Sequence, residues 1–143
     1  MTAKEYLEQA RYLDQMIDSK FMEAESLRSL ATKVTATYSD TPHTTTPDNH
    51  RLEKILTSIA DLENEIDEDI DRFVTLKKEI KDVIGEVKNV KFRTLLEMRY
   101  LSQMTWEQIA VKLGYDLRYT HKIHGRALQK ISVPEEKKDT KRH

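Results

Sequence analysis

The sequence predicts an all-α protein, in which a long antiparallel two-helix hairpin precedes a C-terminal helix-turn-helix domain. Three observations lead to this fold class. Two long stretches repeat apolar residues at helical spacing, and the second keeps a heptad like that of a coiled coil. Only three glycines and three prolines occur among the 143 residues, so turns are few. Two short amphipathic stretches near the C-terminus are joined at a single glycine.

The first long helix is predicted over residues 3–38. Its apolar residues recur in steps of three and four, which is the spacing of one helix face. Lys20 interrupts this stripe, and a lysine that extends its ammonium group to water explains it better than a polar residue that sets the register. The stripe comprises Tyr6, Ala10, Leu13, Ile17, Ala24, Leu27, Ala31 and Val34, widened by Leu7, Phe21 and Leu30.

A linker is predicted over residues 39–50, which hold two prolines among Ser, Thr, Asp and Asn. His43 and His50 flank it and are expected to be solvated, because a metal site needs more ligands than two. A second helix is predicted from Pro47-Asp48 to residue 87, with a heptad sustained over about five repeats. The heptad positions are Leu52, Ile59, Ile66, Phe73, Ile80 and Val87, and Ile55, Leu62, Asp69, Leu76 and Val83.

Asp69 alone breaks this heptad. The acidic run from Glu63 to Asp71 around it is expected to be a solvated face, because successive helix positions point in different directions. The two long helices have similar lengths, so they are predicted to fold back on each other. A lone hairpin buries little apolar surface, and we therefore expect it to self-associate as a two-fold dimer.

The predicted domains are the hairpin, residues 1–87, the helix-turn-helix domain, residues 88–131, and a disordered polar tail, residues 132–143. Gly85 and Asn89 mark the junction between the first two. The first helix of the second domain is predicted over residues 88–101. Its inward side chains are Phe92, Leu95, Leu96 and Tyr100.

Three local signals define the helix-turn-helix. Thr105 and Gln108 have the spacing of a capping box, which opens a helix with Trp106, Ile109, Ala110 and Leu113 on its inner face. Gly114 can take the left-handed conformation that ends a helix. Asp116 can cap the next helix, predicted over residues 117–131. The inner face of that helix would be Thr120, Ile123, Ala127, Leu128 and Ile131.

The outer face of this last helix is predicted to enter the major groove of double-stranded DNA. Arg and Lys side chains reach guanine acceptors or phosphates, and His can hydrogen-bond base edges. Gly125 also lies within this helix, at a cost of about 1 kcal/mol relative to Ala. The base-reading candidates are Arg118, Tyr119, His121 and Lys122, and the phosphate-contact candidates are Arg126, Arg99 and Lys130.

Charge is distributed unevenly along the chain, although its formal net charge is only −1. Residues 1–87 hold 11 Lys and Arg against 19 Asp and Glu, whereas residues 88–143 hold 13 against 6. A basic C-terminal part is the pattern of a phosphate-binding surface. The acidic front part would be repelled by DNA and is expected to contact protein.

Several functional classes are excluded by what the sequence lacks. There is no cysteine, which fits a reducing cytoplasm and excludes thiolate metal sites. No apolar run has the length of a membrane span and no signal peptide is recognisable. His121 and His124 have no acidic or thiol partner nearby, so no metal site is predicted. No phosphate loop or nucleophile with its base is present, so neither an enzyme nor a cofactor is expected.

The run from residue 90 to 131 resembles the fourth conserved region of bacterial sigma factors, the part that reads an upstream promoter element. Asp116 departs from the Ser or Thr that is usual there, and Gly125 is a second departure. More narrowly, the layout resembles late-operon transcriptional regulators of phages and integrated elements (ArpU/RinA-like). The matching residues are Leu95, Arg99, Tyr100, Thr105, Trp106, Ile109, Ala110, Leu113, Gly114, Tyr115, Ile123, His124, Arg126, Ala127, Leu128 and Lys130.

The resemblance implies a sequence-specific DNA-binding transcriptional regulator that acts on DNA alone or docks on RNA polymerase. A complete sigma factor is excluded, because the acidic front part lacks a basic, aromatic helical face. Two alternatives remain open. A viral small terminase-type DNA-packaging subunit would form a ring of many copies, and a pure protein-interaction coiled coil would show no salt-sensitive DNA binding.

Overall fold

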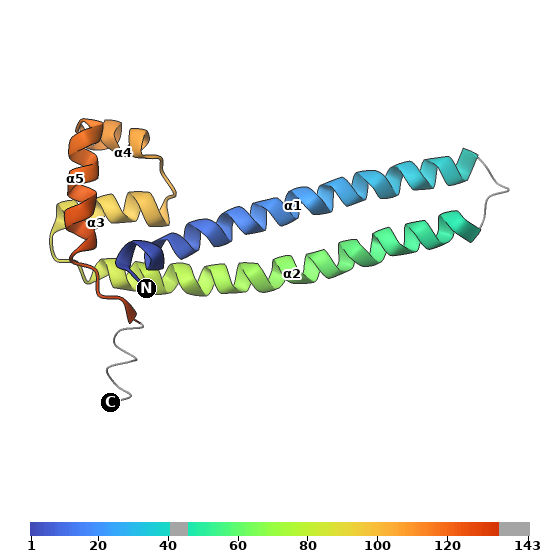
Figure 1. The fold of residues 1–143 in the computed structure, drawn as a ribbon, viewed down its shortest axis with the longest axis horizontal. Helices are drawn as coiled ribbons and strands as arrows, with labels where there is room; N and C mark the ends of the chain where they lie inside the picture. The colour runs from blue at the N-terminus through green and yellow to red at the C-terminus, as the bar shows by residue number, and fades with distance from the viewer. Residues whose placement is uncertain (41–45, 135–143) are drawn as a thin grey trace, which may run out of the picture. The chain divides into compact units, whose positions relative to one another are not determined.

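The structure is a computed structural model of the chain and describes residues 1–40 and 46–134. It contains helices and no strand within those residues, which confirms the all-α prediction (Figure 1). The elements are α1 (Ala3–Asp40), α2 (Thr46–Gly85), α3 (Val90–Leu96), a π-helical turn η1 (Glu97–Leu101), α4 (Trp106–Leu113) and α5 (Leu117–Leu128).

The chain divides into two compact units, which are described separately. Unit 1 comprises Met1–Leu13 and Phe73–His143, and unit 2 comprises Asp14–Arg72. This division differs from the predicted boundary at residue 87. The physical reason lies in the core of unit 1, where Leu7 and Ile84 are buried in the same cluster as Tyr100.

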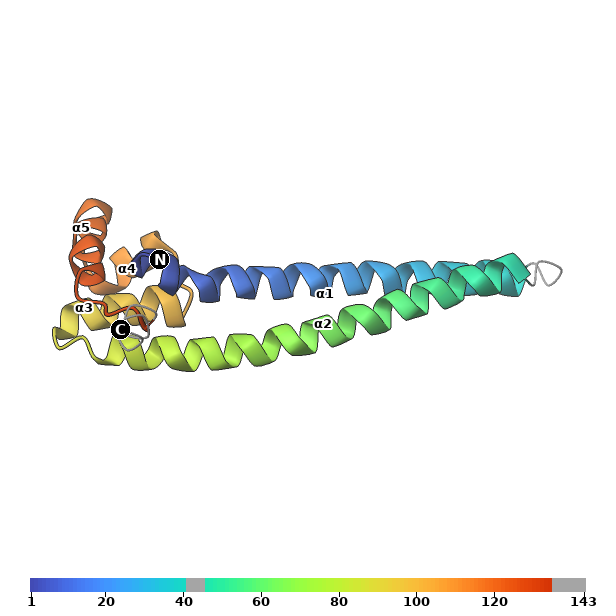
Figure 2. The same cartoon turned by 60° about the horizontal axis from the view of Figure 1, so that its bottom comes forward.

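Unit 2 consists of parts of α1 and α2 that run side by side in opposite directions (Figures 1 and 2). Its core forms two clusters along the seam between the helices. Side chains from both helices contribute, because the stripe on one helix faces the heptad on the other. The buried members are Ala24, Leu62 and Ile66 in one cluster and Val34, Ile55 and Ile59 in the other.

The predicted linker is too long. Helix α1 continues to Asp40 and α2 already begins at Thr46, whereas the prediction left residues 39–50 as a loop. Pro47 is compatible with this start, because the first turn of a helix needs no backbone N–H from it. His43 lies outside the described residues.

Lys20 and Asp69, the two residues that break the apolar pattern of unit 2, are partners. Lys20 Nζ lies 2.6 Å from Asp69 Oδ2, and Asp69 is only 1% exposed. Arg72 donates a second hydrogen bond to this carboxylate. The hydrogen bond from Lys20 holds the pKa of Asp69 below its ordinary value. The expectation that Lys20 extends to water was therefore wrong, because its ammonium group meets a buried carboxylate.

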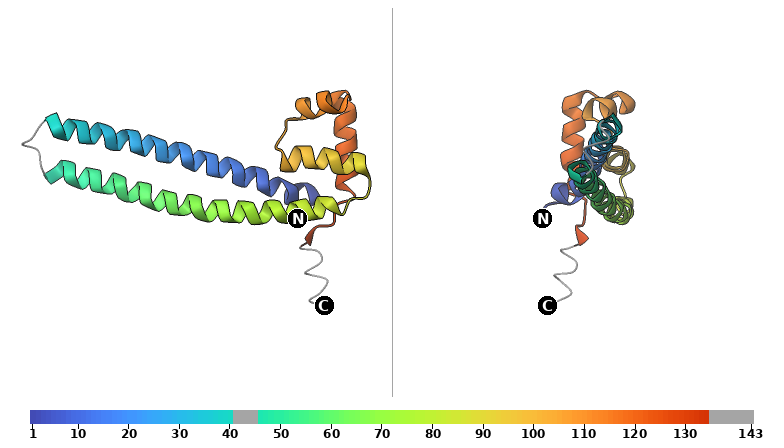
Figure 3. Two further views of the ribbon diagram at one scale, coloured as in Figure 1. Left: turned by 180° about the vertical axis from the view of Figure 1, so that it is seen from behind. Right: turned by 90° about the vertical axis from the view of Figure 1, so that its right-hand side faces the viewer.

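Unit 1 is built around two further clusters. The first joins the ends of α1 and α2 to α3 and α5, and Leu96 and Ala127 are fully buried within it. The second joins α3, α4 and α5 through Leu95, Ile109 and Ile123. Figure 3 shows these three helices from behind and from the side. Val133 belongs to the first cluster at 3% exposure, so the chain is still packed one residue beyond the predicted start of the tail.

Candidate nucleic-acid interface

The turn between α4 and α5 has the geometry that its sequence predicts. Thr105 and Gln108 form a complete capping box, with backbone-to-side-chain distances of 2.9 and 3.2 Å. Gly114 ends α4 in the left-handed conformation, at φ 74°. Asp116 Oδ1 then accepts a hydrogen bond of 2.7 Å from the backbone of Tyr119 and caps α5. Together the capping box, the left-handed glycine and the cap at Asp116 set the direction in which α5 leaves the turn.

The inner face of α5 is buried against α3 and α4 (Figure 1). Thr120, Ile123 and Ala127 are at most 2% exposed, as predicted. Leu128 and Ile131 are half-buried. The helix ends at Leu128, three residues before its predicted end, and a turn follows in which Lys130 and Ile131 donate backbone hydrogen bonds to Ala127 and Leu128.

The outer face of α5 carries four exposed side chains from the predicted set. They occupy positions 118, 121, 122 and 126, which project away from the buried face of the same helix. Lys130 is exposed in the turn that follows and lines a shallow depression with Lys88 and Phe92. The four exposed side chains on the helix are Arg118, His121, Lys122 and Arg126.

Tyr119 differs from these four, because it is half-buried in its own domain rather than exposed. Its ring meets that of Tyr115 edge-on, with the centroids 4.9 Å apart. Lys91, on α3, lies over both rings and donates a 3.3 Å hydrogen bond to the Tyr119 hydroxyl. The two tyrosine hydroxyls raise the pKa of Lys91. The sequence contained no local signal for Lys91, which is 28 residues from its partner.

Arg99 is held at the turn that precedes α4. Its guanidinium lies 4.5 Å from the centre of the Trp106 ring, and Nη1 donates a 3.0 Å hydrogen bond to the Met104 carbonyl. Burial lowers its pKa. The contacts tie Arg99 to the fold of the domain, while a phosphate contact through the same side chain stays a prediction.

His124 was not assigned to either face from the sequence, and the structure buries it. Its Nε2 atom lies 2.7 Å from the Tyr100 hydroxyl, and its ring packs 4.4 Å from Trp106. Burial lowers the pKa of His124 to about 4 and raises the pKa of Tyr100. At neutral pH the phenol is therefore protonated and the imidazole is neutral, and one hydrogen bond joins the two groups. The pair joins η1 to α5 behind the exposed face.

Comparison with known proteins adds a family. Residues 45–131 match the family described as "Protein of unknown function (DUF1492)", which is more than half of the chain. The chain belongs to the DUF1492 family. The match runs from the first residues of α2 through the whole of α5. Neither a curated protein nor a solved structure matches the chain.

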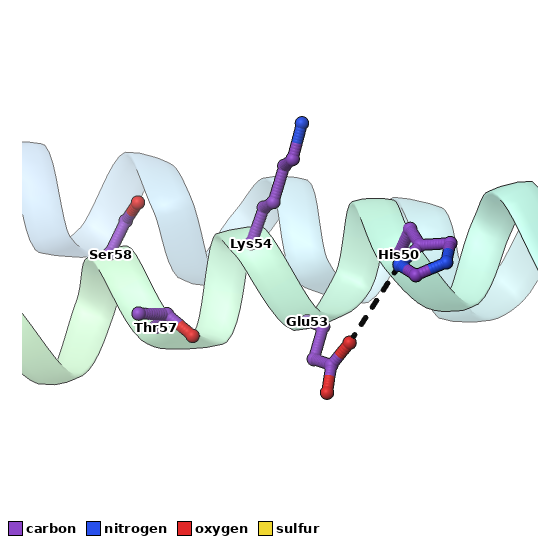
Figure 4. Close-up of a pocket in the computed structure, with 5 residues that line it drawn as sticks. All are labelled: His50, Glu53, Lys54, Thr57 and Ser58. Atoms are coloured by element: carbon purple, nitrogen blue, oxygen red, sulfur yellow. Dashed lines mark ion pairs between the residues drawn. The ribbon is translucent and has the colours of Figure 1, made fainter.

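A second depression in this DUF1492 protein lies on α2, within unit 2. His50, Glu53, Lys54, Thr57 and Ser58 line it. All five are exposed, and Figure 4 shows them diverging from one helix rather than converging on a point. One ion pair joins His50 Nδ1 and Glu53 Oε2, at 3.9 Å. Among the described residues no group of three or more metal-ligating side chains occurs, and no described helix is long and apolar enough to cross a membrane.

Proposed function

We propose that this protein is a sequence-specific DNA-binding transcriptional regulator whose helix α5 enters the major groove. The observation that carries the proposal is the two-sided character of α5. One side is packed into the domain through Thr120 and Ile123, and the other exposes Arg118, His121 and Lys122 immediately after a glycine turn. A capped helix presented in this way is the arrangement by which helix-turn-helix proteins contact base edges.

Charge supports a nucleic-acid partner. The C-terminal part from residue 88 holds 13 Lys and Arg against 6 Asp and Glu. Phosphate attraction of this kind guides a protein to DNA, while the side chains that reach base edges select the sequence. In this proposal Lys122 and His121 read bases, and Arg126 and Lys130 contact the phosphates that flank them.

The partners of the rest of the chain are proposed more broadly. The protein would act in the cytoplasm of a phage-bearing host, on DNA alone or docked on RNA polymerase. Two copies would pair, since unit 2 exposes several large apolar side chains that a dimer could cover. Those side chains are Met16, Phe21, Met22, Leu30 and Leu56.

Selection of bound fragments from genomic DNA tests the proposal. The full chain is expected to enrich a defined sequence motif, and its affinity is expected to fall steeply with salt. Recovery of fragments without a shared motif would contradict sequence-specific binding. Native mass, measured on the same preparation, separates a dimeric regulator from a ring-forming packaging subunit.

The Lys122→Ala variant tests whether α5 is the element that recognises the selected DNA motif. It is expected to relax preference at one base position, at a cost of about 1–3 kcal/mol. Lys54→Ala is the matched control, because Lys54 is also an exposed lysine, on α2 in unit 2. Equal loss of preference in both variants would show that α5 is not the reading element.

A further inference from the structure

Gly125 lies in the interior of α5, where glycine is unfavourable. Glycine loses more backbone freedom in a helix than any other residue, and alanine would be preferred at such a position. Glycines are retained at such positions where the backbone needs a left-handed conformation or where a neighbouring atom leaves no room for a side chain. Neither condition applies to Gly125.

The backbone of Gly125 is ordinary and the space around it is open. Among the described glycines only Gly114 has a positive φ. A Cβ atom built onto Gly125 would meet no other atom within 4 Å. The residue is exposed and lies within the regular span of α5. The folded chain by itself therefore gives no reason for glycine here.

The side chains that surround Gly125 indicate which kind of ligand could occupy the open space beside it. Helix geometry puts residues three and four positions away beside it on the same face. Three of these four neighbours, His121, Lys122 and Gln129, are exposed, whereas Leu128 is half-buried. Arg126 follows Gly125 directly and is also exposed, so two of the exposed side chains are permanently cationic. The result is a bare stretch of helix backbone bordered by groups that attract phosphate and hydrogen-bond to bases.

We propose that Gly125 is the point of closest approach between α5 and DNA, where the wall of the duplex touches the helix backbone. This inference rests on the proposed function and adds a steric requirement to it. A side chain at position 125 would hold the helix away from the groove. Lys122 and Arg126 would then reach the duplex only at longer distances, although their own chemistry would be unchanged.

Gly125→Ala and Gly125→Leu test the inference in the full-length chain. Both residues are better helix formers than glycine, so the melting temperature is expected to rise by a few degrees. Affinity for the duplex that the wild type selects is expected to fall roughly tenfold for alanine, as for one extra methyl group in a fitted site, and further for leucine. Opposite shifts in stability and affinity would not arise from a purely structural role.

Gly85→Ala is the matched control. Gly85 ends α2, and a Cβ added there also meets no atom within 4 Å. This variant is expected to bind the selected duplex as tightly as the wild type. If the Gly125 variants are more stable yet bind as tightly as the wild type, the inference is wrong while the proposed function stands. If the wild type selects no duplex at all, both are wrong.

Discussion

The two compact units differ in whether the residues that break their regular sequence patterns have partners within the chain. In unit 2 the residues that break the apolar pattern, Lys20 and Asp69, find each other across the seam between α1 and α2. In unit 1 the glycine of α5 and its exposed cations Arg118, Lys122 and Arg126 have no such counterpart among the contacts of the described residues. His121, on the same face, packs against Trp106. The comparison teaches where to look for function. An irregularity that is satisfied inside the chain serves the fold, and the one that is not is where our proposal places the external partner.

The largest effect on stability is expected from substitution of Trp106, which packs against α5. Trp106 packs against His121, His124 and the Arg99 guanidinium. Trp106 is half-buried, so Trp106→Ala should destabilise unit 1 by about 3 kcal/mol, the low end of the range for a buried aromatic residue. Urea denaturation measures this effect. Val111→Ala, on the same helix and 82% exposed, is the control and should change stability by less than about 0.5 kcal/mol.

The buried imidazole of unit 1 makes stability depend on pH. The pKa of His124 is about 4 in the folded chain and near 6.5 when unfolded. The unfolded chain therefore binds more protons between these values, so stability is complete above pH 6.5 and falls as the pH approaches 4. We expect the free energy of unfolding to fall by about 2 kcal/mol between pH 6.5 and 4, a value that allows for solvent near the ring.

Denaturation at a series of pH values measures this loss. His124→Gln keeps a hydrogen-bonding group opposite Tyr100 but removes the titration. Its stability should change much less between pH 6.5 and 4. An equally steep loss in this variant would assign the acid sensitivity to other groups. Asp69 contributes little in this range, because the lowering of its pKa makes its stabilising effect fall mainly as the pH drops through and below the ordinary value of 3.8.

The smallest effect on stability is expected in the seam of unit 2. Lys20→Met leaves the Asp69 carboxylate with Arg72 as its remaining partner among the described contacts and should lower stability. Adding Asp69→Leu completes the heptad and should restore or exceed the original stability, because well-packed apolar residues often replace a buried ion pair without loss. A double mutant less stable than the wild type would show that the pair contributes more than its replacement.

Local signals predicted much of unit 1. The capping box of Thr105 and Gln108, the turn at Gly114 and the cap at Asp116 each act within a few residues, so the sequence alone reveals them. The exposed face of α5 followed from helical periodicity. Whether Arg118, His121 and Lys122 contact DNA stays a prediction, because exposure permits such contacts without proving them.

Contacts between distant residues could not be predicted. Lys20 and Asp69 are 49 positions apart, and each alone suggested a solvated charge. Tyr100 and His124 are separated by 24 positions, and their pairing depends on how η1 meets α5. The heptad predicted which face of α2 is buried, but it did not reveal that Leu7 and Ala10 would join the core of the C-terminal domain. Such contacts depend on the tertiary alignment of helices.

The affinity of the full chain for its selected duplex, compared with a scrambled duplex of equal length at matched salt, tests the central claim most directly. If the outer face of α5 reads base edges, the selected duplex should bind roughly a thousandfold more tightly or better. Equal affinity for the two duplexes would mean that the face attracts phosphates only, and would contradict the account.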